Sequence, residues 1–529
     1  MTTSEINQYA RSTSSRQRWT LLLVLTAAFM LLLDITVVSV ALPSIQRDLG
    51  ASLADLQWVS AAYALALAVL LLPAATLGDR IGRRRVFLVG MVVFTIGSLA
   101  SALATTALAL ELFRALQGAG GAALFASATP LLRAEFSGRA LGRALGAFGA
   151  TLGGASAIGP LVGGALTDTL GWRSIFFINL PVGVIALMIG WAKLHESRNP
   201  VGGRADWVGT GLIVVALTAL MFALIRGNSS GWASPEILTL FTIAAVALAA
   251  FVFYELRIAA APMADLRLFG RRSFAVTGFV GFAISATVIG TITYLSLYVQ
   301  NTLGNSPVQG GLRLVPMFVA SFAVALLTGR LIGKVPMRVL LGGAMASAAA
   351  GLASMAHLTA TSGWLVLLPG LILAGIGLGI TSTALASAAL GAVEPERAGM
   401  AAGLTNTLRQ LGTATGVAVF GALYADRVNA ATVHALAGVA LRPDAIHRLA
   451  AAVASRAGTR VAASLPPDIR AAVAHAARVG TASGLNDVLL AAAAFAALGA
   501  IVGFAFGPDP SKQAPTRPTA VAEPTAPRS

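Results

Sequence analysis

The chain contains no cysteine and few charged residues. None of its 529 residues is cysteine, only 21 are Asp or Glu, and charged residues make up 11% of the sequence. The missing cysteines exclude disulfides, thiolate metal ligands and cysteine nucleophiles. The five histidines have no acid at ligand spacing, so we expect no metal site. A nucleotide-binding Gly-Lys-Ser/Thr loop is also missing, which predicts no cofactor and an ion gradient rather than ATP as the energy source.

Hydrophobic residues dominate what remains. They form 57% of the chain, and the mean hydropathy is +0.80, which predicts an all-α integral membrane protein. A spanning helix needs about 20 apolar residues, and the sequence offers about fourteen such runs. We place them at 19–42, 54–77, 86–104, 107–132, 143–167, 174–192, 207–225, 237–254, 274–298, 309–328, 338–357, 364–390, 400–425 and 488–506.

The net charge of +16 reflects orientation rather than nucleic-acid binding. The arginines lie mainly in alternate loops between the apolar runs, as the positive-inside rule predicts for cytoplasmic loops. Both termini then lie in the cytoplasm. The preference for arginine over lysine and the abundance of alanine favour a GC-rich bacterial genome, so we expect the inner (plasma) membrane of a bacterium.

The apolar runs divide into six, two and six, which predicts two bundles of six helices and two extra central helices. A faint repeat supports a duplicated bundle, because Leu77–Arg83 has a counterpart in Gly329–Lys334. Repeated halves around a midplane site are a common transporter plan. The predicted parts are a cytoplasmic tail at 1–18, a first bundle at 19–192, a linker region with two spans at 193–273, a second bundle at 274–507 and a disordered cytoplasmic tail at 508–529.

The stretch 428–485 is the long hydrophilic segment inside the second bundle, and by parity of crossings it lies outside the cell. Asp444 can cap one helix, and Pro467 with Asp468 can start another. We predict a helical hairpin on the outer mouth. Docking of a partner or gating of the cargo are the alternatives.

Asp34 lies inside an apolar run. A carboxylate in hydrocarbon is costly, so it marks a candidate ion or substrate site. It lies nine residues before Pro43, and Arg114 lies about seven residues below the outer end of its own span. Both are therefore about 10 to 14 Å deep and can meet. In the alternative, Glu111, one helical turn from Arg114, neutralises the arginine locally.

Several segments, in order, resemble the fourteen-span drug:proton antiporters of the major facilitator superfamily. They are Leu33–Pro43, Gln57–Tyr63, Leu77–Arg85, Arg114–Gly121, Gly159–Gly164, Gly171–Pro181, Leu297–Gln300 and Asn406–Gly412. The resemblance implies the major facilitator fold, a proton or cation site at Asp34 and proton transfer at Arg114. The small residues Gly159, Pro160, Gly163 and Gly164 match the signature of exporters, and they suit a span that packs closely or bends.

The same resemblance implies a conformational latch at Asp79, Arg80, Gly82 and Arg83. Asp79 can accept charge-assisted hydrogen bonds from nearby arginines and sit at a helix N-terminus, so breaking these contacts would release one conformation. Positive-inside charge explains the arginines alone, but neither Asp79 nor Gly82.

Polar and aromatic residues supply further candidates. We expect Gln57, Trp58, Tyr63, Tyr294 and Tyr298 to line the substrate cavity, although Trp58 and Tyr63 fit an interfacial aromatic belt as well. In the second half Arg313 and Arg409 are embedded candidates without an acidic partner nearby, and Asn406 is a further candidate. They can meet backbone carbonyls, water or the substrate.

The sequence therefore predicts a proton-coupled antiporter, not an enzyme. It would export hydrophobic, in some cases cationic, drugs or toxic metabolites by alternating access. The same scaffold could instead export one metabolite, a siderophore or a lipid. We expect a monomer in the lipid bilayer with a small-molecule substrate. The need for a periplasmic adaptor stays open.

Overall fold

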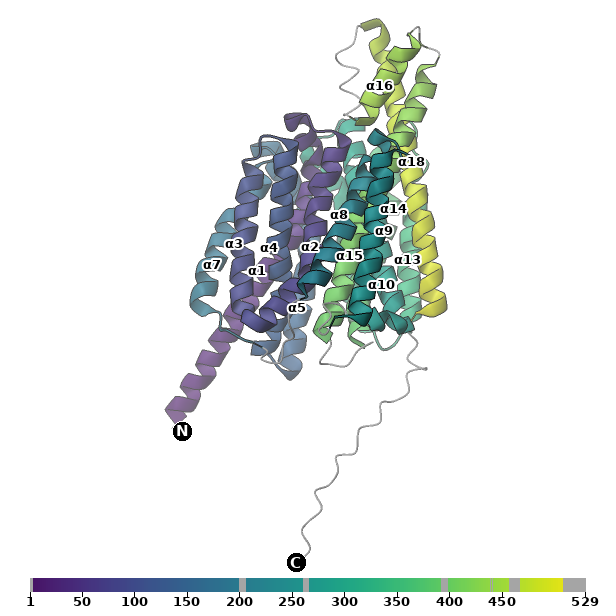
Figure 1. Cartoon of the computed structure of the whole chain (residues 1–529). Coiled ribbons are helices and arrows are strands. Elements are labelled where there is room, and N and C mark those ends of the chain that lie inside the picture. The colour runs from purple at the N-terminus through teal and green to yellow at the C-terminus, as the bar shows by residue number, and fades with distance from the viewer. Residues whose placement is uncertain are drawn as a thin grey trace, which may run out of the picture.

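The computed structural model describes residues 3–198, 206–259, 266–391, 398–437, 439, 441–455 and 467–507. Its helices stand side by side as a bundle, with α7 at one edge of the view and α18 at the other (Figure 1). The first half contains α1 (Thr3–Leu49), α2 (Leu53–Ile81), α3 (Arg83–Ala102), α4 (Ala107–Glu135), α5 (Gly138–Leu170), α6 (Ser174–Phe177) and α7 (Asn179–Lys193). The central pair is α8 (Trp207–Ser230) and α9 (Pro235–Arg257).

The second half begins with a short 3-10 turn, η1 (Leu266–Gly270), and a broken helix. That helix consists of α10 (Arg272–Ile284), η2 (Ser285–Ile289), α11 (Gly290–Leu297) and η3 (Tyr298–Thr302), where η2 and η3 are π-helical. The rest comprises α12 (Pro307–Leu331), α13 (Met337–Met355), η4 (Trp364–Leu367), α14 (Leu368–Gly391), α15 (Ala398–Leu436), α16 (Pro443–Ser455) and α18 (Pro467–Phe506).

Eleven helical runs in the described part of the chain are long and apolar enough to cross a membrane. The helices α4, α5 and α15 lie among them (Figure 1) but are not in that set. Glu111 and Arg114 lower the hydropathy of α4, and α5 and α15 are rich in glycine and alanine. The structure thus gives an all-helical multi-pass membrane protein, and the predicted total of fourteen spans stays a prediction.

The two halves repeat each other in their turns. Gly50 and Gly304 both have positive φ, and each comes two residues before a serine that caps the next helix. Ser52 forms a capping box with Asp55, and Ser306 forms one with Gln309. Such reciprocal hydrogen bonds satisfy free amide groups at a helix start. Gly82 and Gly333 repeat the positive φ at the opposite ends of α2 and α12.

The repeat extends to close contacts between helices. A side chain on Gly118 of α4 would overlap the carbonyl oxygen of Tyr63, and one on Gly375 of α14 would overlap that of Met317. Tyr63 and Met317 both lie eleven residues after their capping serines. Small residues allow such close approach in membranes. These paired contacts support the duplicated bundle that the sequence predicts.

The halves meet along two seams, α5 with α12 and α2 with α15. The central pair packs on the second seam, since α8 contacts both α2 and α15. Trp58 of α2 lies against Phe222 of α8, with ring centroids 4.5 Å apart. The two extra helices therefore cover the outside of a seam rather than separate the halves.

Three predicted boundaries fall inside helices. The stretch 1–18, predicted as a cytoplasmic tail, includes the start of α1 at Thr3. The spans expected to end at 425 and begin at 488 belong to the longer helices α15 and α18. Hydropathy marks where a helix leaves the membrane, whereas these helices continue as amphipathic extensions. The tail at 508–529 lies outside the described residues.

The outer hairpin therefore consists of these two extensions and α16. It projects from the side opposite to both the start of α1 and the end of α18 (Figure 1). Ile446 and Leu449 of α16 pack against a cluster formed by Leu436, Val473 and Ala476. The hairpin is thus an upward continuation of the bundle. We call its side of the molecule the upper side.

Candidate functional site

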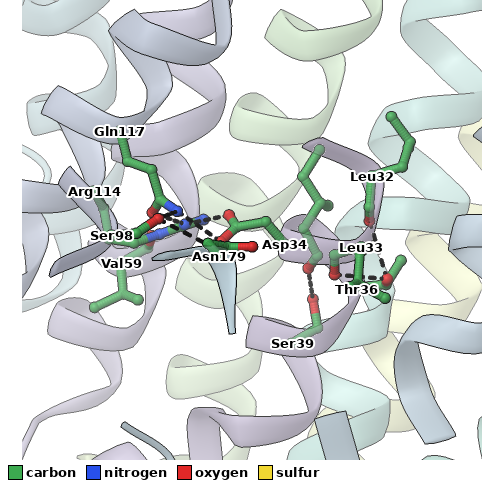
Figure 2. A network of polar contacts seen from close by, with 11 residues as sticks. Leu32, Leu33, Asp34, Thr36, Ser39, Val59, Ser98, Arg114, Gln117 and Asn179 are labelled. Atoms are coloured by element: carbon green, nitrogen blue, oxygen red, sulfur yellow. Dashed lines mark hydrogen bonds and ion pairs between the residues drawn. The ribbon is translucent and has the colours of Figure 1, made fainter. Parts of the chain in front are cut away.

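Asp34 lies in the middle of α1, where it is 3% exposed. Its Oδ2 pairs with Nη1 of Arg114 from α4, which is 1% exposed. The two side chains point toward each other across the first half (Figure 2). The meeting expected from their equal depth is confirmed, and each charge neutralises the other where neither could remain unpaired cheaply.

Two amides complete the shell around the carboxylate (Figure 2). Nε2 of Gln117 donates to Asp34 Oδ1 at 2.8 Å and to Ser98 Oγ at 2.7 Å. Nδ2 of Asn179 donates to the same two oxygens at 3.4 and 3.2 Å. These contacts tie α1 to α3, α4 and the first residue of α7. Every partner of the carboxylate in the described structure is a hydrogen-bond donor.

Arg114 is held from several sides. Its Nε donates to the carbonyl oxygen of Val59 at 3.2 Å, and its Nη1 also donates to Gln117 Oε1 at 2.6 Å. The guanidinium carbon lies 4.3 Å from the centre of the Tyr63 ring and 5.8 Å from that of Phe176. A cation held by both an acid and aromatic faces is strongly localised.

The structure favours this pairing over the local alternative. Glu111 makes no ion pair with Arg114 in the part of the chain that the structure describes, although the two residues are one turn apart on α4. Gly159 and Gly163 of α5 lie against Thr36 and Val37 of α1, just beyond Asp34. The exporter signature therefore packs directly on the helix that carries the acid.

The same signature joins the two halves. The carbonyl oxygen of Pro160 approaches Gly311, and Gly164 approaches Pro307, so α5 contacts the first turns of α12 without intervening side chains. Pro160 lies within α5.

The residues expected to line a cavity are buried or half-buried in this structure. Gln57, Tyr63, Tyr294 and Tyr298 are at most 3% exposed, and Trp58 is half-buried. Nε2 of Gln57 donates to the Tyr294 hydroxyl at 3.3 Å, and that hydroxyl donates to the carbonyl oxygen of Val417. In this conformation these polar groups close the upper side, and contact with a cargo stays a prediction for them.

A second hydrogen bond closes the upper side near α1. Nε2 of Gln300 donates to the carbonyl oxygen of Val40 at 2.7 Å. At the upper end of the same helix Asp48 accepts from Trp172 at 2.9 Å and from Arg173 at 2.5 Å. The segment Gly171–Pro181 therefore fastens the end of α1 to α6, which is a structural role.

The latch has one expected and one unexpected partner. Asp79 accepts two hydrogen bonds from Arg83, at 2.8 and 3.1 Å, while Arg80 is exposed. The group at the N-terminus of α3 is Glu196, which accepts from the Arg84 amide at 3.1 Å. Its carboxylate fills the space beside Gly82, whose φ of 118° also suits glycine.

In the second half the embedded candidates lie apart. Arg313 of α12 stacks over the ring of Trp364, 5.5 Å from its centre. Asn406 and Arg409 are both on α15 and are half-buried. None of the three contacts Asp34 or Arg114 in the described structure.

Sequence reasoning missed Ser98, Gln117, Asn179 and Glu196. The three around Asp34 are neutral residues inside spans, and each is at most 2% exposed. Gln117 could have been found, because it follows Arg114 by three residues on the same helix face. Nothing local marks Ser98 or Asn179, since their partners are remote in sequence.

Comparison with known proteins places this arrangement in a family. The sequence profile of the Major Facilitator Superfamily matches residues 24–417. The chain belongs to this superfamily. It is a multi-pass membrane transporter rather than an enzyme.

Its relatives include named resistance and export proteins. It is 37% identical over 403 residues to the multidrug resistance protein Stp of Mycobacterium tuberculosis, covering 76% of this chain and 75% of that protein. It is 37% identical over 420 residues to a probable actinorhodin transporter of Streptomyces coelicolor, covering 77% and 72%. A bacterial homologue of the lysosomal transporter Spinster, solved facing inward, matches with a TM-score of 0.62 at 18% identity, covering 94% of this chain and 99% of that one. The last match supports the fold alone.

Proposed function

We propose that this superfamily member exports hydrophobic small molecules, such as drugs or toxic metabolites, across the bacterial cytoplasmic membrane in exchange for protons. The observation that carries the proposal is the buried pair of Asp34 and Arg114. A proton on Asp34 would remove the charge that Arg114 and the two amides hold, so protonation would loosen α1 from α3, α4 and α7.

Alternating access has support in the glycines of the α5 and α12 seam. Gly164 and Gly146 of α5 are eighteen residues apart, about five turns, so they point the same way. Gly164 touches α12, whereas a side chain at Gly146 would meet nothing within 4 Å. On α12, Gly311 touches α5 while Gly329, again eighteen residues on, has open space.

One face of each helix is thus packed above and free below. With the lower side in the cytoplasm, as the arginine-rich loops favour, this is the arrangement of an inward-open exporter with a closed outer mouth. Closing the lower ends and parting the upper ones would expose the opposite side. We further propose fourteen spans with both termini inside.

The relatives favour a second candidate for the cargo. Some are named for single compounds, among them a cephamycin export protein of Amycolatopsis lactamdurans. These names favour a transporter that is specific for one compound. The alternative proposal is therefore export of one specific metabolite, with the same proton coupling through Asp34.

Inverted membrane vesicles test the proposal. The vesicles are energised with a proton gradient, a panel of antibiotics, lipophilic cations and neutral compounds is added, and lumenal pH is recorded. We expect a proton efflux on addition of a cargo, and Asp34→Asn should abolish it while the protein remains inserted. Response to many compounds favours multidrug export, and response to one favours the specific alternative. Proton efflux that persists in Asp34→Asn would remove Asp34 from the coupling.

A further inference from the structure

One face of α15 carries a polar stripe in the middle of the membrane. Asn406, Arg409, Gln410 and Thr413 have the spacing i, i+3, i+4 and i+7, so they share a face of the helix. All four are half-buried rather than fully buried. Arg409 comes eleven residues after the start of α15, about 16 Å into the helix. Such depth is far from either membrane surface.

The stripe does not face lipid. One face of α15 beside the stripe is taken by α2, because the Thr407 hydroxyl donates to the carbonyl oxygen of Ala68 at 3.2 Å. Another is taken by α10, where Gly412 packs on Phe282 and the Arg409 stem lies over Gly281. The stripe lies between these two faces. Since α2 belongs to the first half and α10 to the second, it faces the space between the halves.

Arg409 is a charge without a counter-charge there. Its stem lies over Gly281 of α10 and near Leu385 of α14. Its Nε is buried and has no hydrogen-bond partner. Within the residues that the structure describes, the Arg409 side chain forms neither an ion pair nor a hydrogen bond, and the same holds for the side chain of Gln410. No Asp or Glu occurs in the sequence of α10 to α14.

An unpaired guanidinium at this depth is costly unless an anion or water reaches it. A guanidinium presents a planar fork of N–H donors that matches a carboxylate in two parallel hydrogen bonds. We propose that Arg409, with Gln410 beside it, binds an anionic oxygen group of the cargo, such as a carboxylate or phenolate. This site rests on the proposed export function and gives it a cargo class, apolar molecules with an acidic group.

Two dyes with the same xanthene core test the assignment. Fluorescein is anionic at neutral pH and rhodamine 123 is cationic. Binding of each to purified protein in nanodiscs of zwitterionic lipid is measured by fluorescence polarisation, without any proton gradient. We expect the wild type to bind fluorescein about tenfold more tightly than rhodamine 123. Arg409→Gln should lose that preference, Arg409→Lys should keep part of it, and Arg409→Glu should reverse it.

The matched control is Arg313→Gln, an embedded arginine of the same half whose partner is the Trp364 ring, and it should keep the preference. Size-exclusion profiles show which variants are folded, and the wild-type preference is readable even if one variant is not. Equal binding of the two dyes by the wild type, or fluorescein binding that survives in folded Arg409→Gln, would overturn the site. Because the measurement needs no gradient, failure of proton exchange in vesicles would count against the export proposal and leave this result standing.

Discussion

The buried arginine of the first half is fully engaged, whereas the one in the second half has no partner in the described structure. Arg114 binds Asp34, Gln117, a carbonyl oxygen and two aromatic rings. Arg409 has no such contact, although α4 and α14 use the same glycine packing in both halves. The packing between helices is therefore repeated in the two halves, whereas the charged contacts are not.

This difference indicates a division of labour. A closed set of donors around one acid suits a group that changes charge, because each state of the acid has a defined cost. A guanidinium with unpaired N–H donors suits a group that binds an acceptor on the cargo. We infer that proton coupling belongs to the first half and cargo recognition to the second.

The largest expected effect separates these two roles. Asp34→Asn should lower uphill export by on the order of 100-fold, because the carboxamide cannot carry the proton. Arg409→Gln should weaken cargo binding but leave the number of protons exchanged per cargo unchanged. Parallel measurement of cargo flux and lumenal pH in vesicles checks both. If Arg409→Gln changed the number of protons exchanged per cargo, Arg409 would take part in proton coupling as well as in cargo recognition.

Arg114→Ala should be nearly as damaging as loss of the acid. Removing one partner of a buried ion pair typically costs about 3 to 5 kcal/mol, and Asp34 would then lose the cation that holds it in place. Export and thermal unfolding of the purified protein are the measurements. Glu111→Gln is the control on the same helix and should keep export within about threefold. A harmless Arg114→Ala with a damaging Glu111→Gln would reinstate the local pairing.

Because the helix packing is repeated, equivalent substitutions should have equal effects on stability in the two halves. Gly118→Ala and Gly375→Ala each place a methyl group against a backbone carbonyl, and overpacking of this kind costs about 1 to 3 kcal/mol. Both should lower the thermal unfolding midpoint by similar amounts. Gly343→Ala is the matched control, because a Cβ there meets nothing within 4 Å. A large difference between Gly118→Ala and Gly375→Ala would argue against equivalent packing.

The sequence predicted well how deep a residue lies in the membrane, but poorly which way its side chain points around the helix. Span ends and the helix rise were enough to bring Asp34 and Arg114 together, because depth depends only on counting residues. Which face of α3 or α7 points inward depends on packing, so Ser98 and Asn179 could not be assigned. Glu196 was missed for the same reason, since it reaches the start of α3 from 112 residues away. The continuity of α15 and α18 was missed because hydropathy ends before those helices do.

The smallest expected effect concerns Asn179, the longest contact in the shell of Asp34. Asn179→Ala removes a donor that lies 3.4 Å from the carboxylate, so export should fall only about three- to tenfold. The same loss releases α7 from the acid, so the number of protons exchanged per cargo should also fall below that of the wild type. Parallel measurement of cargo flux and lumenal pH in vesicles checks both.

The control for that change in ratio comes from the second half. Thr291 is also buried, but its hydroxyl donates only to carbonyl oxygens of its own helix, Thr287 and Val288. Thr291→Val should change the rate slightly and leave the ratio of protons to cargo unchanged. If both variants lowered export without changing that ratio, Asn179 would be a packing residue like Thr291, and the coupling shell would consist of Asp34, Arg114 and Gln117. A changed ratio in Asn179→Ala alone would extend that shell from α4 to α7, and would make the start of α7 part of the element that responds to the proton.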